Sequence, residues 1–183
     1  MTETREDPLH SLFARLDEAR AERVTESAGE ATRAFLCFWL AGEEYGVDIR
    51  EIREISKMRV VTPVPRVSRD VMGVMALRGA MIAVVDLRLR LGLESPDEPL
   101  GSRRILVVKR NAELIGLLVD EVTDVIRLTA AAIEPPPPMT PPRGAAVGRA
   151  VIESVAGVGR IDERTLILLD LDAVMELEAK GDS

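Results

Sequence analysis

Short apolar segments separated by turn residues dominate the chain from Arg33 onward, and they constrain its fold more than any other feature. Segments this short and this regularly spaced, with few helical patterns between them, predict the strands of an all-β barrel or sandwich. The segments expected to be strands are 34–40, 45–49, 71–75, 81–86, 105–109, 114–119, 122–128, 146–155, 160–162 and 165–169.

Turn residues set the connections between these segments. Gly42-Glu43-Glu44 joins the first two segments and predicts a β-hairpin. Leu77-Arg78-Gly79 separates the next two, and its glycine can take the positive φ that a turn or bulge requires. Pro63 and Pro65 lack the backbone N–H of a central strand, so residues around them are expected outside a sheet interior.

Three isoleucines, beginning at the end of the second segment, allow two interpretations. Ile49, Ile52 and Ile55 are three residues apart, which suggests one or two helical turns. A strand that begins at Ile52 is the alternative. Residues 92–101 read as a loop, and the proline-rich residues 134–142 are expected to be an extended, stiff surface connection.

Helical patterns occur at both ends of the chain. Leu9, Leu12, Phe13 and Leu16 form one apolar stripe of a helix, and residues 21–31 read as a polar linker. This helix either packs on its own domain or binds a partner in a groove. Residues 170–179 predict a final helix.

Composition excludes several classes of function. The formal charge of −7 disfavours nucleic-acid binding and adhesion to anionic lipid, both of which depend on Lys and Arg. The apolar runs are too short for a membrane helix, and no signal peptide is evident, so we expect a cytoplasmic protein. The single cysteine, Cys37, excludes an intramolecular disulfide and is expected to be buried.

The sequence offers no convincing catalytic or metal site, and no cofactor is expected. His10 is the only histidine and lies in the N-terminal extension, away from any nucleophile. Phosphate-binding loops, dinucleotide fingerprints and zinc-binding helices do not occur. Asp86, Asp120 and Asp170 each follow an apolar strand, and we interpret them as acceptors of backbone N–H groups rather than as catalytic acids.

A resemblance to a known family emerges from the order of several short motifs. EEYGVDI, IREI, TPVP, GVMALRG and VVDLRLRLG follow one another within residues 43–92, and further matches reach Leu171. This order closely resembles the CheW family, the coupling proteins of bacterial chemotaxis arrays, over roughly residues 33–177. The resemblance implies two packed five-stranded SH3-like β-barrels, with short N-terminal and C-terminal helices. Residues 33–179 would form this domain, and residues 1–32 the helical extension and linker.

The resemblance also implies partners and contact residues. A CheW-like protein would be a non-enzymatic scaffold that couples the cytoplasmic tip of a methyl-accepting chemoreceptor to the regulatory domain of a CheA-type histidine kinase. Glu54 and Arg78 match the family's receptor-facing glutamate and arginine, and Ala76 stands where the family commonly has asparagine. The full set expected at the receptor surface is Ile52, Glu54, Gly73, Val74, Arg78 and Gly79. The kinase is expected on the second barrel, from Ile105 to Leu169.

A regulatory module is the alternative function. In that case the N-terminal helix would occlude the docking groove or recruit another protein.

Overall fold

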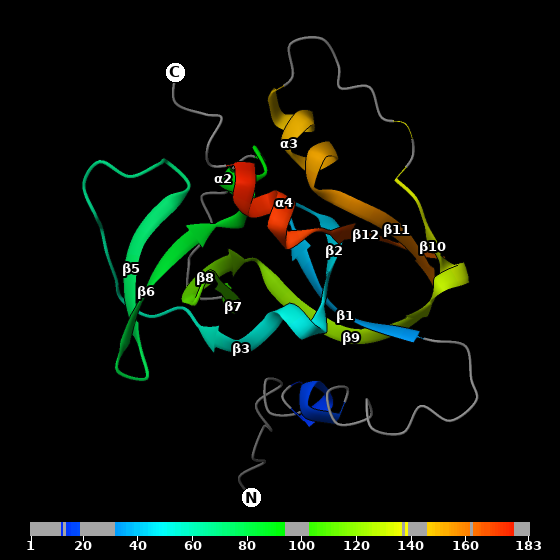
Figure 1. The fold of residues 1–183 in the computed structure, drawn as a ribbon, viewed down its shortest axis with the longest axis horizontal. Coiled ribbons are helices and arrows are strands. Elements are labelled where there is room, and N and C mark those ends of the chain that lie inside the picture. Colours follow the sequence, from blue (N-terminus) through cyan, green and yellow to red (C-terminus); the bar gives the residue numbers. More distant parts are fainter. Residues whose placement is uncertain are drawn as a thin grey trace, which may run out of the picture.

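The computed structural model describes residues 12, 14–18, 32–93, 103–136, 138, 146–161 and 163–177. Within these ranges the chain is mostly β-strand, and the strands form two six-stranded sheets with a few short helices around them (Figure 1). Each sheet consists of five longer strands and one strand of two residues. The predicted all-β class is therefore confirmed.

Sheet A joins strands from both ends of the chain. Its spatial order is β10-β11-β12-β2-β1-β9, and β12 runs parallel to β2 while the other neighbours are antiparallel. The predicted N-terminal hairpin is present as β1 and β2. The strands are β1 (Thr32–Leu40), β2 (Glu43–Asp48), β9 (Glu121–Thr129), β10 (Ile133–Glu134), β11 (Val155–Ile161) and β12 (Arg164–Leu169).

Sheet B contains the middle of the chain. Its order is β3-β7-β8-β6-β5-β4, with β6 parallel to β8. The short β4 ends immediately before Pro63 and lies at the edge of the sheet, as the prolines predict. The strands are β3 (Ile52–Lys57), β4 (Val61–Thr62), β5 (Val71–Leu77), β6 (Ala80–Asp86), β7 (Arg104–Arg110) and β8 (Glu113–Val119).

The predicted assignment of one barrel to the stretch from Ile105 to Leu169 is wrong. β7 and β8 complete sheet B, whereas sheet A combines β9–β12 with the N-terminal β1 and β2. This division depends on the parallel pairs β6–β8 and β2–β12. It was not predicted because parallel neighbours are joined by long connections, so their pairing leaves no local signal in the sequence.

The expected strand over residues 146–155 is also wrong. Most of it is α3 (Ala146–Ser154), and β11 begins at Val155. The Oγ of Ser154 donates a hydrogen bond to the carbonyl of Ala150, one helical turn earlier, at 2.8 Å. Short apolar runs fit either a buried strand or a helix, so the period of the pattern could not decide between them.

The other short helices match the expectations more closely. Of the final helix predicted over residues 170–179, the structure describes α4 (Leu171–Glu176), while Glu178 lies outside the described residues. α2 (Leu87–Arg90) follows β6 directly. Between β2 and β3, η2 (Ile49–Glu51) is a single 3-10 turn, so both interpretations of the three isoleucines apply in succession.

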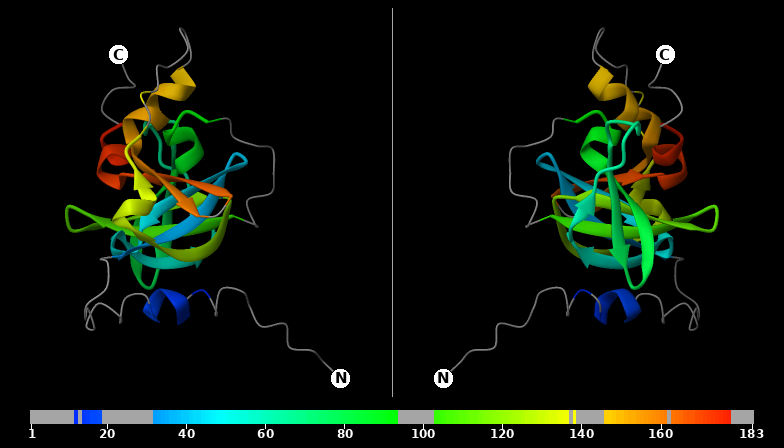
Figure 2. Two further views of the ribbon diagram at one scale, coloured as in Figure 1. Left: turned by 90° about the vertical axis from the view of Figure 1, so that its right-hand side faces the viewer. Right: turned by 90° about the vertical axis from the view of Figure 1, so that its left-hand side faces the viewer.

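The largest apolar cluster includes residues of both sheets and two leucines of the N-terminal extension. Leu12 and Leu16 belong to this core together with Leu36, Ile52 and Leu106. Residues 12 and 14–18 are helical, and Figures 1 and 2 show this helix against the domain. The expectation that the helix packs on its own domain is thus confirmed for its described part.

Several predicted features lie outside the described residues. They are Leu9, His10, Phe13, the linker 21–31, residues 94–101 of the predicted loop, and most of the proline-rich stretch 134–142.

Candidate docking surface

A two-residue turn projects Arg78 from the domain. Leu77 of β5 pairs with Ala80 of β6, which leaves Arg78 and Gly79 as the turn. Both have positive φ, 47° for Arg78 and 84° for Gly79. This is the pattern of a type I′ turn, whose twist matches that of the flanking strands. The expectation of a positive φ at Gly79 is confirmed, and the turn leaves the Arg78 side chain 79% exposed.

A bulge in β3 brings Glu54 to the same surface. The register between β3 and β7 shifts between Ile52 and Glu54, so one extra residue is inserted there. Ile52 and Ile55 consequently both point into the core, and Glu54 between them is partly exposed. Without the bulge, Glu54 would face the same side as Ile52, because side chains alternate along a strand.

Glu54 and Arg78 meet in space. The Arg78 Nε lies 3.0 Å from Glu54 Oε2 and 3.2 Å from Oε1. An ion pair as exposed as this one contributes only about 0–1 kcal/mol to folding. Its two charges are therefore free to be recognised by another molecule at little cost to the domain.

The remaining predicted receptor residues divide into surface and core positions. Val74 is partly exposed on β5, whereas Ile52 and Gly73 are buried. Gly73 has φ +141°, and a Cβ built on it would lie 2.1 Å from the carbonyl oxygen of Thr62. Glycine is thus required there for β4 to approach β5. Ile52 and Gly73 are therefore core positions, while Glu54, Val74 and Arg78 are accessible to solvent.

Exposed apolar side chains were missed in the sequence. Met81, opposite Ala76 in the β5–β6 ladder, is 62% exposed beside the Arg78 turn. The segments on either side of β4 expose three valines, of which Val60 is 88% exposed. The sequence did contain a signal for the valines. They are apolar residues in a proline-containing loop, where no strand face is available to bury them. The exposed set among the described residues is Trp39, Val60, Val64, Val67, Met81 and Leu114.

The strand-terminal aspartates have structural roles. Asp86 Oδ1 accepts the backbone N–H of Arg88 at 2.9 Å, and Asp120 Oδ2 accepts that of Ala41 at 2.9 Å. Asp170 caps α4 by accepting two backbone N–H groups. The interpretation of all three as acceptors of backbone N–H groups is confirmed.

Arginine partners of these aspartates were not foreseen. The buried Arg103 lies 3.0 Å from Asp86 and 3.3 Å from Asp120. Arg88 Nε donates to Asp120 Oδ1 at 2.7 Å. Since Asp120 also binds the β1–β2 turn through Ala41, this buried ionic network connects sheet B to sheet A.

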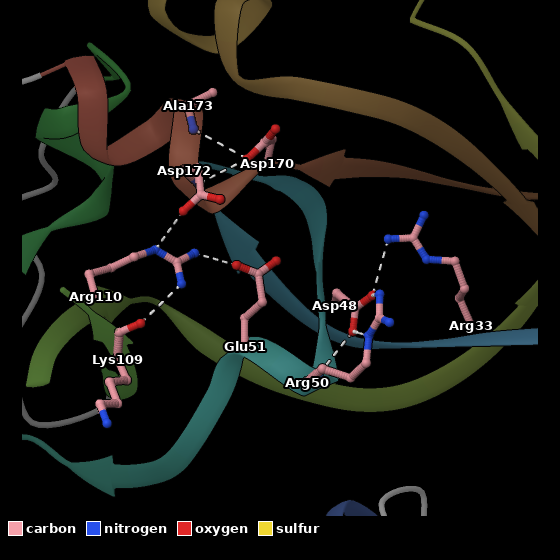
Figure 3. Close-up of polar contacts among 9 residues, drawn as sticks. All are labelled: Arg33, Asp48, Arg50, Glu51, Lys109, Arg110, Asp170, Asp172 and Ala173. Atoms are coloured by element: carbon pink, nitrogen blue, oxygen red, sulfur yellow. Dashed lines mark hydrogen bonds and ion pairs between the residues drawn. The ribbon is translucent and has the colours of Figure 1, made fainter. Parts of the chain in front are cut away.

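A second polar cluster lies where η2 meets α4 (Figure 3). Arg110 at the end of β7 contacts both Glu51 of η2 and Asp172 of α4, the latter at 3.0 Å. Beside it, Asp48 binds Arg50 and Arg33. Of these groups, Arg33, Asp48 and Glu51 line a cavity of about 190 Å³. The cluster joins the connection between the sheets to the C-terminal helix.

Asp48 and Cys37, both in this half of the molecule, have shifted pKa values. Burial alone would raise the pKa of Asp48, but hydrogen bonds from the side chain and backbone of Arg50 and from Arg33 outweigh it and hold the pKa below its ordinary value. Burial, followed by the nearby Glu44, raises the pKa of the Cys37 thiol to about 12. Cys37 is therefore a buried apolar residue, as expected.

Within the described ranges, no group of His, Cys, Asp and Glu side chains is arranged to hold a metal ion. None of the helices described there is long and apolar enough to cross a membrane.

Comparisons with known proteins agree with this geometry. The model of the CheW-like domain family matches residues 34–179. The chemotaxis protein CheW of Klebsiella aerogenes is 35% identical over 158 residues, which cover 85% of this chain and 89% of the relative. That of Helicobacter pylori is 30% identical, covering 92% and 96% respectively. The crystal structure of the scaffolding protein TtCheW from Thermoanaerobacter tengcongensis superposes with a TM-score of 0.69 at 30% identity, covering 83% of this chain and 98% of TtCheW. The chain belongs to the CheW-like family.

Proposed function

We propose that this protein is a chemotaxis scaffold that couples methyl-accepting chemoreceptors to a CheA-type histidine kinase. Its relatives are named as chemotaxis and scaffolding proteins, and the family match spans nearly the whole strand-rich part of the chain. Members of this family couple and support other proteins rather than transform substrates, and the chain is not an enzyme. We further propose that it acts in the cytoplasm, at membrane-bound receptor arrays.

The exposed Glu54–Arg78 pair is the observation that carries the receptor assignment. Both charges are held by rigid β-structure, one by a bulged strand and the other by a two-residue turn. An arginine presents several donors in a planar fork, which suits it to the centre of a protein interface. The proposed receptor site comprises Ile52, Glu54, Gly73, Val74, Arg78 and Gly79, with Met81 as an added apolar contact.

For the kinase we propose a separate surface, so that both partners bind at once. The sequence-based expectation places it between Ile105 and Leu169, where Leu114 in the β7–β8 hairpin is exposed. The exposed valines at positions 60, 64 and 67 support a rival location on the loop beside β4. Either surface offers exposed apolar side chains to a partner. Individually modest interfaces gain strength when several act together in an array.

A binding experiment tests the proposal. Purified protein is mixed with a receptor signalling fragment, with the kinase, and with both, and the complexes are separated by size-exclusion chromatography with light scattering. We expect two binary complexes and a ternary complex. Binding to one partner alone, or mutually exclusive binding, would contradict coupling.

A further inference from the structure

The two sheets repeat one arrangement of strands. Read from β9, sheet A has the order β9-β1-β2-β12-β11-β10, and read from β3, sheet B has the order β3-β7-β8-β6-β5-β4. The third and fourth strands of each order are its parallel pair. Each fourth strand leads into a short helix capped by an aspartate, Asp86 for α2 and Asp170 for α4. The chain therefore contains two equivalent halves, and a position in one half can be compared with its counterpart in the other.

Two glycines support this correspondence. The register between the fourth and fifth strands shifts at Gly73 in sheet B and at Gly157 in sheet A. A Cβ on Gly73 would collide with the carbonyl oxygen of Thr62, the last residue of β4. A Cβ on Gly157 would lie 2.9 Å from the carbonyl oxygen of Glu134, the last residue of β10. Both halves thus use a glycine to admit the same two-residue edge strand.

Backbone hydrogen bonds of the capping aspartates identify a further equivalent pair. The N–H of Asp86 donates to the carbonyl of Asp70 at 2.7 Å. The N–H of Asp170 donates to the carbonyl of Ser154 at 2.8 Å. Asp70 and Ser154 each stand one residue before the fifth strand of their sheet, so they are counterparts.

The halves differ in the segment that ends at these counterparts. Ser154 is the last residue of α3, which packs against α4 and places Val151 against the core cluster that contains Val174 of α4. Asp70 ends the segment 63–70, which is not helical. Figure 1 shows α3 beside α4, whereas the segment before β5 forms an open loop on the other side of α2. Sheet B therefore has no counterpart of α3 within the described residues.

A cavity of about 350 Å³ lies beside α2, between this helix and the end of the segment 63–70. Its apolar lining is formed by Leu89, Leu93 and Leu177, all of which are half-buried. A cavity of this size is typical of binding sites. The cavity thus leaves apolar side chains open beside α2, whereas α4 is covered by α3 in the other half.

The polar side of the cavity is basic. Asp70 is paired with the buried Arg90, so these two charges neutralise each other. Arg69 also lines the cavity, is exposed, and forms no ion pair with any residue that the structure describes. One positive charge beside three leucines matches an apolar segment that carries an acidic side chain.

We propose that this cavity is a docking site for an acidic, amphipathic helix of a partner protein, which lies beside α2 as α3 lies beside α4. Apolar side chains of that helix contact the three leucines, and a carboxylate pairs with Arg69. The net charge of −7 disfavours an anionic lipid surface as the acidic partner. The inference does not depend on the receptor assignment.

The site is separate from the Arg78 turn. Asp70 immediately precedes β5 (Val71–Leu77), and Arg78 immediately follows it. A strand of seven residues rises about 20 Å from end to end. A helix bound beside α2 therefore leaves the Arg78 turn accessible to a different partner.

Two designed peptides test the proposal on the full-length protein. Both are cross-linked to stay helical and carry leucines along one face, and they differ only in flanking glutamates or lysines. Amide chemical shifts in NMR spectra locate binding and report folding, and titration calorimetry measures affinity. The variants are Arg69→Glu and Leu89→Ala, with Arg59→Glu as the matched control, since Arg59 is exposed and does not line the cavity.

We expect the glutamate peptide to bind about tenfold more tightly than the lysine peptide, and Arg69→Glu to reverse that preference. The shifted amides should be those of residues 68–70 and 89–93. Leu89→Ala should weaken both peptides about three- to tenfold, while Arg59→Glu changes neither affinity. Equal affinity for the two peptides, or shifts confined to other parts of the protein, would overturn the proposal.

A variant that lacks residues 178–183 tests a different occupant, because these residues follow Leu177 of the cavity. If the glutamate peptide binds only to this shortened chain, the site belongs to the protein's own C-terminal segment and the partner helix is wrong. Absence of peptide binding to either chain would also overturn the inference. The proposed coupling function, which is tested with receptor and kinase, would stand in both cases.

Discussion

Arg78 and Glu54 form an ion pair with a separation of 3.0 Å, although 24 positions separate them in the chain. A bulge turns Glu54 outward from β3, and a type I′ turn holds Arg78 at the tip of the β5–β6 hairpin. Both features are backbone devices that aim a side chain. The backbone holds both side chains at the surface, and their ion pair contributes little to the stability of the fold.

Replacement of Arg78 by glutamate tests that division of roles. Arg78→Glu is expected to weaken receptor binding by about 10- to 100-fold, as for a hot-spot residue, because it places two carboxylates together at the docking surface. The free energy of unfolding should change by less than about 1 kcal/mol. Titration calorimetry with a receptor fragment and urea denaturation measure the two quantities.

Arg59→Glu is the matched control, since Arg59 is exposed and follows β3 outside the proposed site. It should leave receptor affinity near the wild-type value. Normal receptor binding by Arg78→Glu would remove the main support for the receptor assignment.

Two glycines of the same hairpin should respond differently to alanine. Gly79→Ala strains a positive φ in open space, which costs about 1–2 kcal/mol. Gly73→Ala adds a collision with the backbone of Thr62, so it should destabilise the domain considerably more or detach β4. Urea denaturation of both variants checks the order, and equal stabilities would contradict the close approach of β4 to β5.

The buried ionic network should be costly to break. Arg103→Met leaves Asp86 without its guanidinium partner in the interior, where removing one partner of a buried pair costs about 3–5 kcal/mol. The same substitution at exposed Arg78 should cost less than about 1 kcal/mol. Thermal and urea unfolding of the two variants provide the comparison. A cost at Arg103 as small as that at Arg78 would show that the network does not hold the sheets together.

Acid should destabilise the domain partly through Asp48. Its pKa lies below the ordinary value in the folded state, so the unfolded state binds a proton first as the pH falls. The stability it contributes is complete above the unfolded pKa of about 3.9 and disappears as pH drops through the lower folded pKa. Asp48→Asn should lower stability at neutral pH and flatten the acid limb of the stability profile. An unchanged acid limb would exclude this role for Asp48.

The position of the kinase contact is decided by paired substitutions. Leu114→Glu tests the expected stretch from Ile105 to Leu169, and Val60→Glu tests the rival loop beside β4. Both side chains are exposed, so neither change should unfold the protein. The one at the interface should weaken kinase binding by about tenfold or more, because it buries a charge in an apolar contact. If neither affects kinase affinity in calorimetry, both locations are wrong.

Local patterns predicted the antiparallel hairpins well. The Gly42 and Arg78-Gly79 turns, and the edge position forced by Pro63, were readable from a few residues, because glycine permits a positive φ and proline fixes φ and lacks a backbone N–H. The helix-like spacing of Ile52 and Ile55 arose from a bulge, which shifts the side-chain alternation by one residue and is invisible before strand register is known.

Long-range features could not be read from the sequence. The parallel pairs that divide the stretch from Ile105 to Leu169 between two sheets depend on contacts between distant segments. The arginine partners of Asp86 and Asp120 likewise come from other parts of the chain. Leu12 and Leu16 signalled an apolar helix face, while the surface that receives it is assembled from β3 and β9 and appears only in the folded protein.

The coupling role is tested most directly by kinase activity in a reconstituted system. Purified kinase and receptor signalling fragments are combined with and without this protein, and autophosphorylation is followed with labelled ATP. The account predicts a large rise in kinase activity that requires all three components and is lost with Arg78→Glu. Kinase activity that is independent of this protein, or equal with the wild type and Arg78→Glu, would contradict it.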